Sequence, residues 1–394
     1  IASHMTGRGR RRGRHSAHWI ADDLDRFGDT YETPDGLIGD SEYFRYLDDL
    51  GLREKEDSWH NPWNYGPGTI SLDARPSELP YEHTQEVWCA RQAMACMQAA
   101  ASDGKPFCIQ IAFQKPHHPL LPNERFWNLY ADDLELPETV DNEPALRPPA
   151  FRRMHEQFHN LKWDYTGLGA TWLDGARRAW RGTLACVSQV DDVFGQLLDF
   201  LDRNGLCENT VVVYGADHGC YHGIHGIVEK APGICSDAVC RVPLIWRGPG
   251  IVDAGRVDER LIENTDITPT LAALCGLPPL DSADGLDASP LLAGGDKPLH
   301  EIAVTENAWS KALRWGRWRF VHYQPETMTA ERDEGELYDL ESDPNERHNL
   351  YHLPDHQDTV NQCRRLLLEW LIRTTRVRTV HPAAKTDVTA GNEE

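Results

Sequence analysis

Residues 184–214 decide the fold and read LACVSQVDDVFGQLLDFLDRNGLCENTVVVY. Apolar side chains recur at helical spacing from Trp180 to Leu201, which predicts one buried face of a long helix. The Asn-Gly pair at 204–205 is typical of a helix end, because glycine tolerates the left-handed backbone found there. The run TVVVY at 210–214 is short, apolar and β-branched, which predicts a buried strand.

The same order of helix and then strand occurs elsewhere in the chain. Residues 83–104 have apolar side chains at helical spacing and precede the run FCIQIAF at 107–113. Another strand-like run, VPLIW, occupies 242–246, and Thr268-Pro269 is typical of a helix start. Alternating helices and continuous apolar strands predict an α/β fold with a mostly parallel sheet sandwiched by helices. Ligands of such sheets bind beyond the carboxyl ends of the strands.

The pattern changes after about residue 298. Short runs predict antiparallel strands at 302–304, 312–313 and 318–322, and a final helix is predicted at about 358–374. We therefore expect four regions: 1–17, a tag remnant (IASHM) with a basic, disordered N-terminus; 18–297, a partial α/β domain; 298–384, a small C-terminal α+β subdomain; and 385–394, a tail.

Composition limits the classes of partner. The chain has 40 Lys and Arg against 62 Asp and Glu, a formal charge of −22, which argues against a nucleic acid or an anionic membrane surface. No apolar run approaches the ~18 residues of a membrane span, and no signal peptide is visible, so a cytoplasmic protein is expected. Ten cysteines without a C-x-x-C pair predict buried thiols rather than a disulfide framework. Whether the protein is a homo-oligomer is left open.

The richest motif, YGADHGCYHGIHGIVEK, begins at the end of the TVVVY strand. Asp217 and His218 follow that strand directly, and such a pair can give one cation an oxygen and a nitrogen ligand. His222 and His225 add potential donors, Lys230 adds a fixed positive charge, and the glycines permit tight turns. The alternative is an aspartate that caps a turn beside a surface histidine.

A second motif, KPHHP at 115–119, follows the predicted strand at 107–113. Its two prolines make the turn rigid and present His117 at the same edge of the sheet as Asp217. A histidine there can act as a general acid that protonates a leaving alcohol. The alternative is a turn histidine whose ring is satisfied by backbone groups.

These motifs together resemble the type I sulfatases of the alkaline phosphatase-like superfamily. The similarity is continuous through 184–250, where the VDDVFG helix, the D-H-G motif, the H-G-x-x-x-K spacing and the RVPLI strand occur in the family's order. KPHHP is similar to the family's K-P-H-x-P turn, and DITP at 266–269 to its D-x-x-P helix start. ELYDLESDPNERHNL at 336–350 is similar to its C-terminal signature, so the resemblance covers most of 80–355.

The resemblance implies a role for each matching residue. Asp217 and His218 would ligate a divalent metal, with calcium the usual ion in sulfatases and magnesium or manganese the alternatives. Lys230 would contact a sulfate oxygen, and His117 would be the general acid or a sulfate-oxygen donor. These roles suit cleavage of a small sulfate ester, because cationic groups stabilise the negative charge that develops on the leaving oxygen.

The chain also departs from the family. The family's nucleophile is a formylglycine made from Cys or Ser in C/S-x-P/A-x-R, and we expect this motif to be absent; the closest string considered is Cys89-Ala-Arg, in a helix. The Asp-Asp pairs at 22–23 and 48–49 lack the apolar strand that precedes the family's metal-binding pair. We therefore expect an N-terminally truncated chain with half a metal site, weak cation binding and little or no activity.

Two other functions stay open. A phosphonate monoester or phosphodiester hydrolase of the same superfamily would use the same metal, histidine and lysine positions. A non-catalytic fragment or pseudoenzyme would explain the missing nucleophile. The aromatic excursion at 59–80, with Trp59, Trp63 and Tyr65, is interpreted either as a substrate pocket or as local packing.

Overall fold

The computed structural model describes residues 42–56, 74–117, 119–140, 147–149, 151–152, 172–227, 235–280, 283–307, 310–324 and 333–375. Several predictions fall outside these residues, namely those on the basic N-terminus, Asp22-Asp23, the aromatics Trp59, Trp63 and Tyr65, Lys230 and the tail.

In the described residues, four helices precede the first strand, and strands and helices then alternate from β1 to α8. The helices are α2 (Glu42–Asp49), α3 (Gln85–Ser102), α4 (Glu124–Trp127), α6 (Trp172–Arg203), α7 (Asp237–Cys240), α8 (Ile267–Leu274), α9 (Ser289–Leu292) and α11 (Gln357–Thr374). The strands are β1 (Val212–Gly215), β2 (Leu244–Arg247), β3 (Ile302–Glu306), β4 (Ser310–Trp315), β5 (Trp318–Tyr323) and β6 (Gly335–Asp339). Short 3-10 turns occur at Arg53–Lys55, Tyr81–His83, Cys207–Asn209, Asn264–Asp266 and Pro354–His356.

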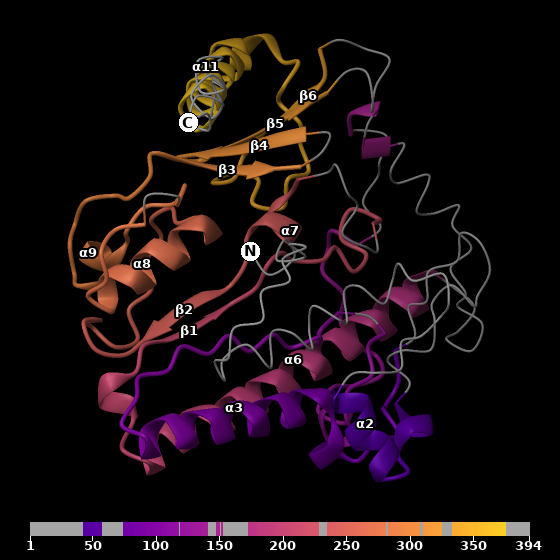
Figure 1. Cartoon of the computed structure of the whole chain (residues 1–394). Helices are drawn as coiled ribbons and strands as arrows, with labels where there is room; N and C mark the ends of the chain where they lie inside the picture. Colours follow the sequence, from indigo (N-terminus) through magenta and orange to yellow (C-terminus); the bar gives the residue numbers. More distant parts are fainter. Residues whose placement is uncertain are drawn as a thin grey trace, which may run out of the picture.

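The two long helices α3 and α6 lie side by side beneath the β1–β2 pair (Figure 1). Their apolar faces form one buried cluster. Its fully buried members are Val87, Ala90, Ala93, Met97, Val193, Leu197 and Leu201. The predicted helices at 83–104 and 180–201 are thus confirmed. Val187 has the helical spacing of the predicted buried face between Trp180 and Leu201, but it is 42% exposed, so the prediction is wrong at this position.

The strand predictions need two corrections. β1 and β2 are present, but they pair antiparallel, with Val212 opposite Arg247 and Gly215 opposite Leu244, whereas a mostly parallel sheet was expected. Their apolar side chains are only half-buried, and Ile245 is 58% exposed. Residues 107–113 are extended and pack on α3 and α6, but they form no ladder with any described strand.

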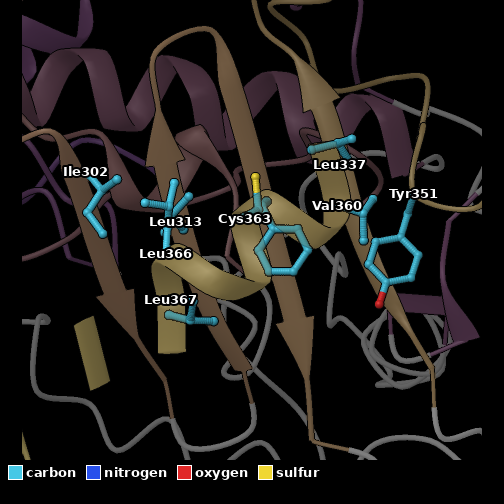
Figure 2. Packing of buried hydrophobic residues seen from close by; sticks show 9 residues of the cluster. Ile302, Leu313, Leu337, Tyr351, Val360, Cys363, Leu366 and Leu367 are labelled. Atoms are coloured by element: carbon cyan, nitrogen blue, oxygen red, sulfur yellow. The ribbon is translucent and has the colours of Figure 1, made fainter. Parts of the chain in front are cut away.

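The C-terminal subdomain is a four-stranded antiparallel sheet in the order β3-β4-β5-β6. Helix α11 covers one face of it (Figure 1). Figure 2 shows side chains from the helix, among them Val360 and Cys363, packed against Leu313 and Leu337 of the strands. The predicted strands near 302, 312 and 318 and the final helix are confirmed. The sequence did not lead us to expect β6, which starts at Gly335 and covers the first four residues of the ELYDL signature.

The cysteine prediction is confirmed only in part. All ten cysteines fall within the described residues and all are free thiols, but only four of them are buried, whereas most were expected to be. Among the same residues, no helix is both long and apolar enough to cross a bilayer.

Candidate active site

The loop at 216–227 starts where β1 ends and presents Asp217 and His218 at the surface, with side chains 44% and 41% exposed. The Asp217 carboxylate accepts a hydrogen bond from the His218 backbone N–H at 2.9 Å. The His218 ring nitrogen Nδ1 lies 2.8 Å from the carbonyl oxygen of Gly219. A carbonyl oxygen only accepts, so Nδ1 carries the proton and, in the neutral ring, Nε2 keeps a lone pair.

That lone pair faces the carboxylate. His218 Nε2 and Asp217 Oδ2 are 3.4 Å apart, and both are acceptors when the imidazole is neutral. Two ligands at right angles, each ~2.3 Å from a calcium ion, would themselves be about 3.3 Å apart. The pair therefore fits one cation. In the described part of the chain, no group of three or more His, Cys, Asp or Glu side chains is placed to hold a metal.

Asn264 supports this loop from the start of α8 and was missed by the sequence reasoning. Its side-chain Nδ2 donates to the Ala216 carbonyl at 3.1 Å, and lies 3.4 Å from the Asp217 carbonyl. Asn264 is held in a 3-10 turn by a reciprocal capping box between Glu263 and Asp266. The turn ends at Asp266, the first residue of the DITP match, and this overlap was the one signal in the sequence that pointed to Asn264. Helix α8 begins at Ile267, one residue earlier than predicted.

The glycines of the loop do two different things. Gly223 and Gly226 have φ of 97° and 73°, as expected for tight turns. Gly219 instead permits a close approach: its N–H donates to the Val239 carbonyl at 2.9 Å, and a Cβ there would lie 2.1 Å from the Ala238 carbonyl oxygen. The D-H-G glycine is therefore the point where the loop lies against the backbone of α7.

The two further histidines of the motif contact α6 and Arg147. His222 Nε2 lies 3.4 Å from the Thr183 hydroxyl on α6. His225 is only 3% exposed, and its Nδ1 lies 2.8 Å from the Arg147 guanidinium. The contact with Arg147 makes His225 part of the interior rather than a donor at the site, and the interpretation of His222 as a potential donor stays a prediction.

The turn that carries His117 is anchored by its neighbour Lys115. The Lys115 ammonium lies 3.0 Å from the fully buried Glu86 carboxylate. Burial alone would lower the pKa of Lys115, but the Glu86 charge outweighs it and the pKa is raised, so the lysine stays charged. Gln189 of α6 also donates to Glu86, at 3.0 Å. The His117 N–H closes the turn on the Gln114 carbonyl, at 2.9 Å.

The same segment lies along α6. A Cβ added to Gly182 would lie 2.9 Å from the Leu120 Cβ, so the chain after the turn crosses the helix there. Burial raises the pKa of the Cys186 thiol to about 12, although the nearby Lys115 ammonium opposes the shift. These contacts place the turn over the part of α6 around residues 182–186.

The 216–227 loop contacts α6 at the same turns of the helix, because His222 lies against Thr183. Residues 182–186 span only about 6 Å of helix. The two predicted motifs are therefore anchored on adjacent side chains of one helix. Direct convergence of His117 with Asp217 stays a prediction, and Lys230 lies outside the described residues.

The expected absence of the nucleophile motif needs a correction. The pattern S-x-A-x-R does occur once, at Ser310–Arg314 (SKALR). It lies on β4 of the C-terminal sheet, where Ser310 is buried and its hydroxyl lies 3.5 Å from the Cys235 sulfur. A buried strand serine whose hydroxyl contacts a buried thiol is not presented to a substrate, so nothing about its setting favours a nucleophile. Cys89 is buried within α3 and is no candidate either.

The chain is similar to known sulfatases and related hydrolases. The chain is 31% identical over 258 residues to the choline-sulfatase of Rhizobium meliloti, which covers 64% of this chain and 47% of that protein. It is 24% identical over 364 residues to a multifunctional alkaline phosphatase superfamily protein of Trinickia caryophylli, covering 83% of this chain and 67% of that one. The chain thus spans about half to two thirds of the length of these relatives.

The fold has matches among solved structures. The phosphonate monoester hydrolase of Silicibacter pomeroyi superposes with a TM-score of 0.70 at 22% identity, covering 84% of this chain and 69% of that one. This likeness confirms the predicted alkaline phosphatase-like fold class. A family model described as N-sulphoglucosamine sulphohydrolase, C-terminal, matches residues 223–372. The sulfatase model matches residues 44–277, more than half of the chain, and the protein therefore belongs to the sulfatase family.

Proposed function

We propose that this chain forms the metal- and ester-binding part of a sulfuric ester hydrolase. One observation carries the proposal: His218 Nε2 and Asp217 Oδ2 lie 3.4 Å apart, while Nδ1 of the same ring is occupied by a carbonyl. Two lone pairs held this close at an exposed strand end repel each other, and a cation bound between them would turn that repulsion into attraction. The residues present therefore suit a divalent metal, with calcium first and magnesium or manganese as alternatives.

Each predicted residue has a task in this scheme. A bound divalent cation would stabilise negative charge on the ester oxygens. His117 would donate a proton to the leaving alcohol, from a turn that the Lys115–Glu86 pair keeps rigid. Lys230 would add a fixed positive charge for a sulfate oxygen. No nucleophile is assigned, so we propose that this chain by itself has little or no activity.

A phosphonate monoester hydrolase is the second candidate. It is favoured by the fold similarity to such an enzyme and by the multifunctional relative. The same cation and donors serve both chemistries, because sulfate and phosphonate esters both develop negative charge on a leaving oxygen.

Calorimetric titration of the full chain with calcium tests the proposal. With only two side-chain ligands assigned, we expect a dissociation constant of about 10⁻⁴ M or weaker. Asp217→Asn should abolish the binding heat, because it removes the anionic ligand. Asp103→Asn is the matched control: this aspartate is exposed and pairs with Lys105 at the far end of α3. Equal binding by the wild type and Asp217→Asn would refute the site, and submicromolar binding would contradict the two-ligand description.

A further inference from the structure

A buried polar cluster joins the 216–227 loop to the C-terminal sheet. Its centre is Arg147, which is only 4% exposed. One arm of the guanidinium donates to the Tyr338 hydroxyl of β6 at 2.6 Å, and also lies 3.4 Å from the Glu336 carboxylate. The other arm lies 2.8 Å from Nδ1 of His225 in the loop. Arg147 thus contacts the two regions at once.

The contact between Arg147 and His225 fixes the state of the imidazole. The guanidinium has donors only, and it lies 2.8 Å from Nδ1 and 3.3 Å from Nε2. The shorter contact favours the tautomer in which Nδ1 accepts and the ring proton resides on Nε2. That nitrogen faces the Glu346 carboxylate at 3.9 Å. Burial, together with the Arg147 charge, lowers the pKa of His225 to about 3. His225 is therefore a neutral hydrogen-bond acceptor.

The loop backbone needs this support. His222 and His225 have φ of 46° and 56°, in the left-handed region that residues other than glycine rarely adopt. Such conformations persist only where surrounding contacts hold them. The His225 N–H donates to the Thr139 carbonyl at 2.8 Å, and the ring accepts from Arg147, so both ends of this residue are fixed.

A second route connects the same sheet to the loop through α7. Glu346 is 2% exposed; its carboxylate accepts from the Asp237 backbone N–H at 3.2 Å and pairs with Arg319 of β5 at 3.2 Å. Asp237 begins α7, and the Val239 carbonyl of α7 accepts from Gly219. The sheet therefore fixes the loop near both its start and its end.

The geometry points to Arg147 as a positioning residue. Arg147 holds His225, and through His225 it holds the 216–227 loop in the shape that presents Asp217 and His218. Because Arg147 also contacts β6, this shape depends on the C-terminal sheet. That this loop shape serves metal binding rests on the proposed function, but the shape itself can be measured without substrate or metal. Arginine is suited to the role because its planar fork reaches Tyr338 and His225 together, which a lysine ammonium cannot do.

Four variants of the full chain separate positioning from simple stabilisation. Arg147→Lys keeps the charge but loses the fork. Arg147→Met removes the charge and leaves Glu336 buried beside an apolar side chain, which should lower the melting temperature. Adding Glu336→Gln to it removes that uncompensated carboxylate and should recover much of the lost stability. Arg317→Lys is the control, because Arg317 lies in the turn between β4 and β5 of the same sheet, is 40% exposed and pairs with Asp339 and Glu341.

Amide hydrogen exchange of residues 219–227 and the ¹⁵N spectrum of the His225 ring are the primary readouts. In Arg147→Lys and in the double variant, we expect the exchange rates of the loop amides to rise about tenfold or more. The loop can then open without first breaking the contact between Arg147 and His225, so opening costs less free energy. The ¹⁵N signal of the Nε2–H tautomer should give way to a tautomer mixture. Arg317→Lys should match the wild type. If loop protection returns together with the melting temperature in the double variant, or Arg147→Lys keeps wild-type protection, Arg147 only stabilises the fold.

Calcium titration of the same variants adds the functional arm. Loss of a residue that orients metal ligands typically weakens metal binding by about 10- to 100-fold, and we expect a weakening in that range for Arg147→Lys. Unchanged calcium affinity in a variant with a freely exchanging loop would overturn the link between loop shape and the site. If the wild-type chain binds no calcium, the proposed function fails, whereas the exchange and ¹⁵N readouts still decide whether Arg147 positions the loop.

Discussion

At the scale of single residues, His218 and His225 differ because of the group that each ring nitrogen contacts. Nδ1 of His218 donates to a carbonyl at the surface, which leaves Nε2 available beside Asp217. Nδ1 of His225 accepts from Arg147 in the interior, which makes the ring part of the packing. Both histidines precede a glycine in the sequence, so their different tasks follow from burial rather than from the local pattern.

Gly219 tests the close approach of the loop to α7. Gly219→Ala would place a Cβ 2.1 Å from the Ala238 carbonyl oxygen, a backbone atom that can move only if α7 moves. We expect a loss of about 2 kcal/mol or more in the free energy of unfolding, measured by urea denaturation. The control is Gly195→Ala in α6, where a Cβ meets nothing within 4 Å and helix propensity should add up to about 1 kcal/mol. Equal effects of the two substitutions would refute the close approach.

Glu86 tests the anchor of the His117 turn. Glu86→Gln leaves the Lys115 ammonium buried without its counter-charge, and breaking such a pair costs about 3–5 kcal/mol. Adding Lys115→Met should restore most of that loss. Lys105→Met, at an exposed ion pair with Asp103, should change the unfolding free energy by less than about 0.5 kcal/mol. A Glu86→Gln protein as stable as Lys105→Met would show that the pair does not hold the turn.

At the scale of elements, the periodic helices were predictable and the strand directions were not. The apolar spacing of α3 and α6 is local and visible in the sequence. The direction of β1 depends on its partner β2, whose register joins Val212 to Arg247 across the intervening loop and α7. Residues 107–113 have the composition of a strand, but a strand forms only beside a partner strand, and the local sequence does not show whether such a partner is present.

The start of α8 gives a pH-dependent prediction. The hydrogen bond from His300 to Asp266, 2.7 Å long, raises the pKa of His300 above its ordinary 6.5. A raised pKa stabilises the fold while the histidine is protonated, so the contribution is complete below about pH 6.5 and is lost as the pH rises through the folded-state value.

The check compares the unfolding free energy of the wild type with that of His300→Gln at pH 6 and pH 8. The difference between the two proteins should be larger at pH 6. His348→Gln, at an exposed position, serves as the control and should show no comparable change. A difference between wild type and His300→Gln that is the same at both pH values would contradict the assigned pair.

At the scale of the whole molecule, the site draws on residues far apart in the chain. Asp217 and His218 are neighbours and were predictable, as was the His117 turn. Asn264 lies 47 residues from Asp217, and Arg147 lies 78 residues from His225. Such supporting residues could not be found from local spacing, because only the fold brings them to the loop. Family membership was predictable because several motifs occur in a fixed order.

Ester hydrolysis by the whole chain gives a further prediction. Without an assigned nucleophile, we expect hydrolysis of an aryl sulfate or an aryl phosphonate ester by this chain to be no faster than that by its Asp217→Asn variant. Ser310→Ala should have no effect, because Ser310 is buried in β4. Turnover that is lost in Asp217→Asn would contradict the proposed inactivity. Turnover that is lost in Ser310→Ala would identify Ser310 as the nucleophile.

Anomalous diffraction from a crystal of the chain soaked in manganese tests the central claim most directly. The account predicts a metal peak within about 2.5 Å of both Asp217 Oδ2 and His218 Nε2, with the His117 imidazole facing the same pocket. A peak that contacts neither of these atoms, or a His117 ring on the opposite side of the molecule from the Asp217 carboxylate, would contradict it.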